Sequence, residues 1–255
     1  MISNSTVKMI QSLKLKKFRQ KYNLFVAEGR KQVSTILQQN HLEVTRVFSS
    51  EIWALKNEAL LHNIEAEIHD DRSLKKLSLL STHSDVIALI NVPDNNIDSV
   101  FQATKVLFLD ELQDPGNLGT IIRIADWYGL DAVIRAEGSA DFFNPKVVQA
   151  SMGSIGAMNL IEMAKTDVPS YLAEFDMIGA DMSSGEIVSS EVRADKTCLV
   201  IGNEGHGISN EISRLLSARI SINGALAKSA ESLNAAIATG ILCQELFGHP
   251  ILRSQ

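Results

Sequence analysis

The sequence has little of several features that would define its class directly. Only two cysteines occur in 255 residues, Cys198 and Cys243, and both stand in apolar runs. They offer neither a disulfide framework nor a metal-ligand spacing, so we expect two buried thiols in a reducing compartment and no metal site. No uncharged apolar stretch reaches the ~18–20 residues of a membrane span, and residues 1–23 lack the apolar segment of a signal peptide. These absences predict a soluble, cytoplasmic protein.

The chain also lacks the strongly positive charge that is common in nucleic-acid-binding proteins, since its net charge is −6. The distribution is uneven, however. Residues 1–100 carry 13 basic and 11 acidic side chains, residues 101–255 carry 11 and 19, and residues 1–31 hold eight bases and one acid. Such asymmetry indicates a local basic patch on an acidic protein. A phosphate-binding surface and a solvated basic terminus are both compatible with it.

Helical and strand-like patterns alternate along the whole chain, which predicts an α/β protein. A basic helix is expected over residues 5–21, within a small α/β domain over residues 1–93. The Pro-, Asn- and Asp-rich segment 91–98 is the predicted linker. The second domain, residues 104–255, begins with an apolar strand at 105–109. Its βα alternation predicts a mostly parallel sheet that is covered on both faces.

In parallel sheets, ligands bind at loops beyond the carboxyl ends of strands, and three such loops here are polar and glycine-rich. The first, Asp114-Pro-Gly-Asn-Leu-Gly119, has a Pro-Gly turn and Asn117 at a position suited to a helix cap. Arg123 follows on the predicted helix. It could meet a phosphate bidentately or pair with a carboxylate such as Asp114.

The second loop, Gly202-Asn-Glu-Gly-His-Gly207, places three glycines around one acid, Glu204. Its G-x-x-G-x-G spacing differs from the G-x-G-x-x-G of dinucleotide folds, which disfavours a Rossmann enzyme. A tight turn with a solvated Glu204 is the simpler interpretation, and His206 is more often a loop histidine than a catalytic base. The third loop ends at Ser232 and Asn234, which could also be plain helix caps.

In this order, the three loops resemble the three signature motifs of the SpoU (TrmH) RNA methyltransferases in the SPOUT superfamily. Residues 114–119 with Arg123 resemble motif 1, residues 201–209 resemble motif 2, and residues 220–224 with 231–234 resemble motif 3. Asn223 stands where motif 3 usually has proline, the 225–230 stretch is longer, and Ala235 replaces the common valine. The first domain is similar to the family's L30e-like substrate-binding domain.

The resemblance implies an N-terminal L30e-like domain and a C-terminal SPOUT domain whose parallel sheet ends in a deep trefoil knot. It implies S-adenosylmethionine as methyl donor, an RNA ribose 2′-hydroxyl as acceptor (EC 2.1.1.-), and a homodimer formed through the C-terminal domain. Family members that modify tRNA tend to lack the large N-terminal domain, so 23S rRNA is expected before tRNA. A catalytically silent RNA-binding protein is the alternative.

The resemblance also assigns residues to roles. Arg123 acts either as the base, together with an RNA phosphate, or as a phosphate clamp, since arginine normally keeps a pKa above ~12. The predicted catalytic positions are Arg123, Asn117, Glu204, Ser232 and Asn234; the donor-binding positions are Ala180, Ile201, Gly202, Gly205, Ile222 and Leu233; the RNA-binding positions are Lys14, Lys17, Arg19, Lys21, Glu28, Gly29 and Arg30.

Overall fold

The computed structural model describes residues 2–181, 195–225, 229 and 232–248. Its contacts divide the chain into two compact units, Met1–Asp94 with Asp141–Ala157, and Asn95–Ala140 with Met158–Gln255. The predicted boundaries, 1–93 and 104–255, place Asp141–Ala157 in the second domain, whereas its contacts group it with the first unit. Pairs such as Phe25 and Phe143, with ring centroids 4.9 Å apart, account for that grouping.

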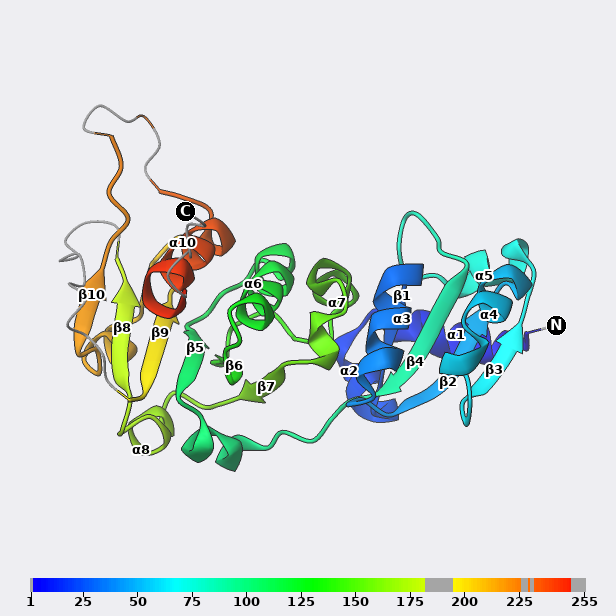
Figure 1. Ribbon diagram of the computed structural model, residues 1–255, viewed down its shortest axis with the longest axis horizontal. Coiled ribbons are helices and arrows are strands. Elements are labelled where there is room, and N and C mark those ends of the chain that lie inside the picture. Colours follow the sequence, from blue (N-terminus) through cyan, green and yellow to red (C-terminus); the bar gives the residue numbers. More distant parts are fainter. Residues whose placement is uncertain (1, 182–194, 226–228, 230–231, 249–255) are drawn as a thin grey trace, which may run out of the picture. The chain divides into compact units, whose positions relative to one another are not determined.

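The first unit is a four-stranded sheet with helices on both faces (Figure 1). Strand β4 is central and antiparallel to β1 and β2, and β3 joins β2 in parallel. Alternate strand residues point to opposite faces, so Val26, Phe48 and Leu89 pack with α1 and α5 on one side. The elements are α1 (Asn4–Ser12), α2 (Lys16–Tyr22), β1 (Leu24–Glu28), α3 (Arg30–Gln39), β2 (Val44–Ser49), α4 (Glu51–Lys56), η1 (Glu58–Leu60), β3 (Glu65–Ile68), α5 (Asp71–Leu77), β4 (Val86–Asn91), α7 (Pro145–Ser151) and η3 (Ser154–Gly156).

The basic helix predicted over residues 5–21 is two helices, α1 and α2. The chain turns at residues 13–15, where Leu13 is fully buried. The guanidinium of Arg19 donates to the carbonyl oxygens of Leu13 and Lys14 at 2.7 and 3.0 Å. Burying Leu13 and satisfying the carbonyls that the break exposes favour the turn over a continuous helix.

The second unit is a six-stranded sheet in the order β10-β8-β9-β5-β6-β7, and every paired strand is parallel. The predicted α/β class and parallel sheet are confirmed. Strand β5 occupies the predicted residues, 105–109. The elements are η2 (Ile97–Gln102), β5 (Lys105–Leu109), α6 (Pro115–Trp127), β6 (Ala132–Arg135), β7 (Asn159–Glu162), α8 (Val168–Tyr171), β8 (Asp176–Ala180), β9 (Thr197–Ile201), α9 (Asn210–Ser213), β10 (Ala218–Ile220) and α10 (Ala235–Phe247).

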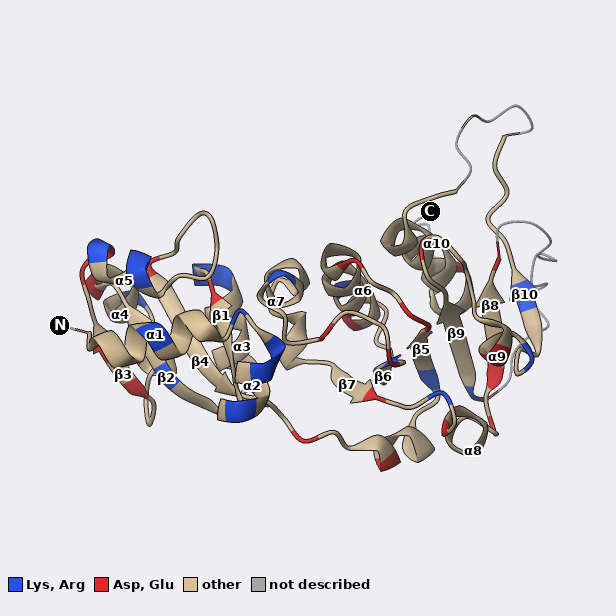
Figure 2. Cartoon of the chain, turned by 180° about the vertical axis from the view of Figure 1, so that it is seen from behind, with Lys and Arg blue, Asp and Glu red and all other residues tan. Residues whose placement is uncertain are grey.

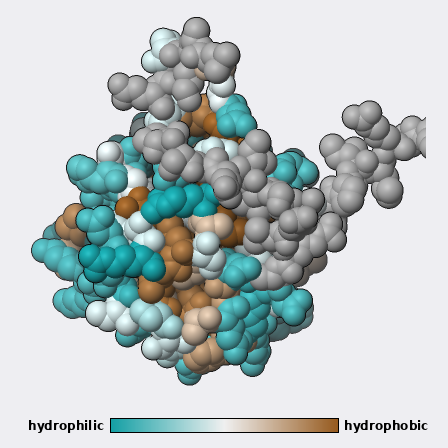
Figure 3. Space-filling model, turned by 90° about the vertical axis from the view of Figure 1, so that its left-hand side faces the viewer, coloured by the Kyte–Doolittle hydropathy of each residue, from teal (hydrophilic) through white to brown (hydrophobic). Residues whose placement is uncertain are grey.

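Both faces of this sheet are covered, as its nearly continuous apolar strands require. Val106, Phe108 and Val200 pack on one face with α8, α9 and η2, while α6 and α10 pack together on the other. Hydrophobic surface is open on the side of the unit where β10 forms the sheet edge (Figure 3). Among the described residues, no helix combines the length and apolar character needed to cross a bilayer.

Candidate functional site

The three polar loops meet at the carboxyl end of the parallel sheet. Strands β5 and β9 are in register, with Leu109 opposite Ile201, so the loops that follow them begin at the same level. The backbone N–H of Asp110 donates to the Ile201 carbonyl at 2.8 Å and extends this pairing into the loops. Helix α10 packs on α6, which brings the end of the third loop beside the first.

A chain of hydrogen bonds joins one polar residue from each loop. The side-chain amide of Asn117 donates to Glu204 Oε1 at 3.0 Å, and Asn234 Nδ2 donates to Asn117 Oδ1 at 2.8 Å. The Glu204 carboxylate also accepts the backbone N–H groups of Gln113 and Asp114, both at 3.3 Å. Three residues that are far apart in sequence, all predicted as catalytic positions, are therefore tied together.

The helix caps in this site differ in part from the prediction. Asn117 was expected to cap α6, but the N-cap is Asp114, whose carboxylate accepts the N–H of Asn117 at 2.7 Å. Pro115 explains the earlier start, because proline lacks an N–H and its fixed φ suits the first helical position. Because Asp114 caps the helix, the side chain of Asn117 is free to hydrogen-bond to Glu204. Asn234 does cap α10, since its Oδ1 accepts from Ala236 and Ile237.

The second loop folds back tightly on itself. Asn203 and Gly207 exchange backbone hydrogen bonds of 2.9 Å, and Gly207 has φ +70°. A Cβ at Gly202 would lie 2.3 Å from the Gly207 carbonyl carbon and 2.4 Å from the Ile208 nitrogen. Because these backbone atoms cannot move aside without disrupting the loop, only glycine fits at position 202.

A cavity of about 550 Å³ opens beside this network, within the range of small-molecule sites. Five of the six predicted donor-binding residues line it, and Ile222 does not. Asn117, Glu204, Ser232 and Asn234 line it as well. A cavity of this size with glycine backbone in its wall fits the predicted methyl donor. The predicted donor residues in the lining are Ala180, Ile201, Gly202, Gly205 and Leu233.

The cavity wall includes an ion pair that the motifs did not single out. Arg219 donates to Asp181 Oδ2 at 2.7 Å and also to the Ser213 hydroxyl. Arg219 lies in β10 and Asp181 follows β8, and these strands pair in parallel across a crossover. Sequence spacing carries no signal for such a pair, because β8 and β10 become neighbours only in the folded sheet. Part of the lengthened third loop, residues 226–228 and 230–231, lies outside the described residues.

Arg123 stands apart from this cavity. It is exposed on α6 and does not line the cavity. Within the described part of the chain it makes no hydrogen bond or ion pair, so the pairing with Asp114 considered above does not occur. Its guanidinium is therefore available to an external anion.

Two predicted RNA-binding side chains are buried and engaged inside the first unit. Arg19 is 3% exposed and pairs with Asp141 at 2.9 Å. Glu28 is also 3% exposed; its carboxylate accepts the Ser78 hydroxyl at 2.6 Å and the Leu79 N–H at 2.5 Å. Burial raises the pKa of Glu28 above its usual value, and this effect outweighs the two hydrogen bonds, which lower the pKa. The Arg19 and Glu28 side chains are thus corrected from RNA-binding to structural positions.

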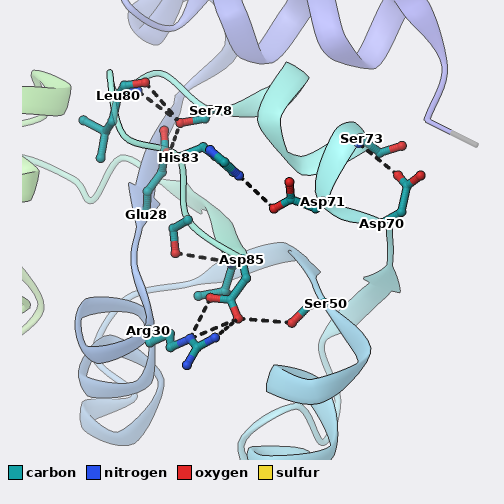
Figure 4. Close-up of polar contacts among 12 residues, drawn as sticks. Glu28, Arg30, Ser50, Asp70, Asp71, Ser73, Ser78, Leu80, His83 and Asp85 are labelled. Carbon is teal, nitrogen blue, oxygen red and sulfur yellow. Dashed lines mark hydrogen bonds and ion pairs between the residues drawn. The ribbon is translucent and has the colours of Figure 1, made fainter.

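The other predicted RNA-binding positions are accessible. Lys14, Lys17 and Lys21 are exposed on or beside α2, where Figure 2 shows basic segments. Gly29 has φ +111° and is the N-cap of α3. Arg30 binds Asp85 through two nitrogens at 2.7–3.0 Å (Figure 4), and this pairing holds the pKa of Asp85 below its usual value. Arg30 nevertheless remains two-thirds exposed.

Comparison with known proteins extends these observations. Residues 104–244 match the SpoU rRNA Methylase family, and residues 4–88 match the MRM3-like substrate binding domain. The chain is 30% identical over 250 residues to the 23S rRNA (guanosine(2553)-2′-O)-methyltransferase RlmP of Bacillus subtilis, covering 96% of this chain and 97% of that protein.

Solved structures agree with this match. The SpoU methyltransferase AviRb from Streptomyces viridochromogenes, in complex with AdoMet, has a TM-score of 0.84 at 25% identity, covering 95% of this chain and 97% of that one. An AdoMet-bound rRNA methyltransferase from Sinorhizobium meliloti gives the same TM-score and identity, covering 96% and 95%. The chain therefore belongs to the SpoU rRNA methylase family and is an RNA methyltransferase that uses S-adenosylmethionine.

Proposed function

We propose that this enzyme methylates a ribose 2′-hydroxyl of 23S rRNA. The hydrogen-bonded chain Glu204–Asn117–Asn234 beside the cavity carries the proposal, because it brings together the three predicted motifs at one point. The full-length similarity to a 23S rRNA 2′-O-methyltransferase supports the substrate. A tRNA is the second candidate. The cytoplasm, where ribosomes are assembled, is the proposed location.

The donor would be held in this cavity by the backbone around Gly202 and Gly205 and by the side chain of Leu233. When bound, S-adenosylmethionine supplies a methyl group that is already activated as a sulfonium. The chain has to orient the acceptor and accommodate the proton that leaves its 2′-hydroxyl. Asn117, Glu204 and Asn234 fix the wall of the cavity, and the exposed side chain of Ser232 also lines it, where its hydroxyl would bind the ribose. Such positioning is worth about 7–11 kcal/mol of barrier in favourable cases.

Arg123 binds a phosphate of the RNA next to the reacting ribose. Its guanidinium is exposed and, among the described residues, without an internal partner, as a phosphate clamp requires. An arginine that holds a phosphate bidentately fixes the acceptor and stabilises developing negative charge. Since arginine keeps its proton at neutral pH, we assign Arg123 to this clamp rather than to proton removal.

The proposed domains are an L30e-like RNA-binding domain at residues 1–93 and a methyltransferase domain at 104–255 that ends in a trefoil knot. RNA contacts Lys14, Lys17, Lys21, the Gly29 turn and Arg30 in the first. A cavity of about 320 Å³, lined in part by Arg30, lies between α3 and α4. Lys31 and Lys56 lie at this cavity, none of the described residues that line it is acidic, and Trp53 and Ile52 give it an apolar wall, so it suits a nucleotide. The match of residues 4–88 to a substrate-binding domain supports this assignment.

A second copy of the chain is the proposed partner of the face formed by α6 and α10. That face exposes Trp127 by 83%, Ile237 by 57% and Ile241 by 44%. Apolar side chains gathered on two packed helices indicate a protein interface. The variant Ile237→Glu/Ile241→Glu should be monomeric by light scattering, whereas Ile52→Glu, at an equally exposed isoleucine of α4, should stay dimeric. A monomeric unsubstituted protein would refute the interface.

The decisive experiment incubates the protein with tritiated S-adenosylmethionine and RNA or ribosomal particles from a strain that lacks its gene, and maps the label by nuclease digestion. Label in a 2′-O-methylated nucleotide of 23S rRNA is the expected result. Label confined to tRNA would contradict the proposal that 23S rRNA is the substrate. Donor binding without transfer to any RNA or particle would make the protein a silent RNA binder. Arg123→Ala should abolish transfer and leave RNA binding within a few-fold.

A further inference from the structure

Lys165 lies between the first two loops of the site, although none of the motifs includes it. It follows strand β7, at the far edge of the sheet from the cavity strands β8 and β10. Its ammonium group contacts Asp110 Oδ1 at 2.8 Å, Glu111 Oε1 at 2.6 Å and the Ser209 hydroxyl at 3.1 Å. The ammonium group therefore donates hydrogen bonds to Glu111 and Ser209 and forms ion pairs with both acidic side chains.

The Lys165–Asp110 pair is largely withdrawn from water, whereas the side chain of Glu111 is 43% exposed. The side chain of Asp110 is 1% exposed and that of Lys165 is 14% exposed. Asp110 Oδ2 accepts the backbone N–H of Ser209 at 2.6 Å, so one buried carboxylate binds both Lys165 and the second loop. A buried ion pair whose carboxylate is also tied to a backbone N–H holds its partners in one geometry.

Glu111, one of the residues that Lys165 contacts, is hydrogen-bonded to Asn203, which lines the cavity. The carbonyl of Glu111, a residue with φ +60°, accepts the Asn203 side-chain amide at 2.8 Å. Asn203 Oδ1 in turn accepts the N–H groups of Gly205 and His206, at 2.8 and 3.1 Å. Lys165, which follows β7, is thereby connected through Glu111 to Asn203, a residue that lines the cavity.

We propose that Lys165 is a positioning residue that sets the second loop into the shape that binds the methyl donor. It acts through Asp110, Glu111 and Ser209, and makes no contact with donor or RNA. The proposal rests on the donor site proposed above. Without the ammonium group, the turn at Glu111 loses its counter-charge and the two loops lose their common partner, so the donor pocket loosens.

Lys196 provides a matched control within the same unit. It is also partly buried, with 21% of its side chain exposed, and it binds Glu174 Oε2 at 2.7 Å and the Phe101 carbonyl at 2.9 Å. It lies at the opposite end of β9 from the loops, immediately before Thr197. Removing its charge should affect stability without affecting the donor pocket.

The experiment compares donor binding by calorimetry and methyl-transfer kinetics in four proteins: unsubstituted, Lys165→Met, Lys165→Arg and Lys196→Met. Lys165→Met should weaken S-adenosylmethionine binding about tenfold and lower kcat/KM about a hundredfold, because small misplacements of a site have effects of that order. The KM for RNA should stay within a few-fold. Lys165→Arg should recover most of the donor affinity, and Lys196→Met should keep all of it.

A double variant distinguishes loss of the donor pocket from loss of the whole fold. Lys165→Met leaves the Asp110 carboxylate buried without a counter-charge, whereas Lys165→Met/Asp110→Asn removes both charges and should melt within a few degrees of the unsubstituted protein. Weak donor binding by this folded double variant supports the proposal, and unchanged donor binding overturns it. Absence of donor binding by the unsubstituted protein would instead refute the donor site itself, which distinguishes the two failures.

Discussion

The side-chain amide of Asn117 donates to Glu204 at 3.0 Å and accepts from Asn234 at 2.8 Å, so one residue joins all three loops. An amide is suited to this position because it carries a donor and an acceptor on one planar group. Glu204 supplies only acceptors and Asn234 presents its N–H₂ group, so the direction of each hydrogen bond is determined.

Asn117→Asp tests this relationship with almost no change in shape. The new carboxylate would face Glu204 at about the same distance and would no longer donate, so the first two loops should repel each other. We expect kcat to fall about a hundredfold. Gln113→Ala is the control, since only the backbone N–H of Gln113 binds Glu204. Equal activity of both variants in the rRNA methylation assay would contradict this role.

Two substitutions at Asn234 separate its two contacts. Asn234→Ala loses the cap of α10 and should lower the free energy of unfolding by about 1 kcal/mol. Asn234→Asp keeps a capping oxygen but cannot donate to Asn117. We therefore expect both variants to lose activity, and only the alanine variant to lose stability in denaturant unfolding. Full activity in Asn234→Asp would show that the bond to Asn117 is unnecessary.

Gly202→Ala should disrupt the donor loop. Its Cβ would overlap backbone at 2.3–2.5 Å, and relieving such overlap in packed structure costs about 1–3 kcal/mol. We expect donor affinity to drop by at least about tenfold. At Gly205 a Cβ would meet only Asn203 Oδ1, at 3.5 Å. Gly205→Ala should consequently keep the fold of the loop and melt close to the unsubstituted protein, and equal losses of thermal stability in both variants would contradict the steric argument.

The lysines of α2 should contribute salt-dependent RNA affinity. Lys17→Ala/Lys21→Ala should weaken RNA binding and reduce the slope of log affinity against log salt by about one for each phosphate contact that is lost. Fluorescence anisotropy over a salt series measures both effects. Lys75→Ala/Lys76→Ala on α5 removes two exposed lysines from the same unit as a control. The same slope change in the control would refute a specific surface on α2.

Glu28 should make stability depend on pH. Burial raises its folded-state pKa above the usual 4.5, so the native state binds a proton that the unfolded state has already released. Its contribution to the unfolding free energy is thus favourable at low pH and is lost as pH rises from about 4.5 through the raised pKa. Glu28→Gln does not titrate, so its unfolding free energy relative to the unsubstituted protein should rise over that window. A parallel pH dependence for both proteins would contradict the raised pKa.

Sequence pattern was sufficient where the signal is local. Apolar runs that end in glycine-rich polar loops predicted β5, β9 and the loops after them, because a strand buried on both faces has to be apolar along its length. Residues 114–119, 201–209 and 220–234 also carried the family resemblance. The loops were predicted to act together, since the carboxyl ends of parallel strands share one edge.

The contacts between these segments followed from the fold. Lys165 stands 55 residues after Asp110 and follows another strand, and nothing in its own neighbourhood marks it as a partner. Arg19 and Glu28 belong to a basic segment that suggested an RNA-binding surface, yet packing buries both side chains. Charge and periodicity are properties of a chain segment, whereas burial and pairing depend on which segments the sheet makes neighbours. The sequence therefore indicated the chemistry, and the tertiary structure determined which side chains are available to perform it.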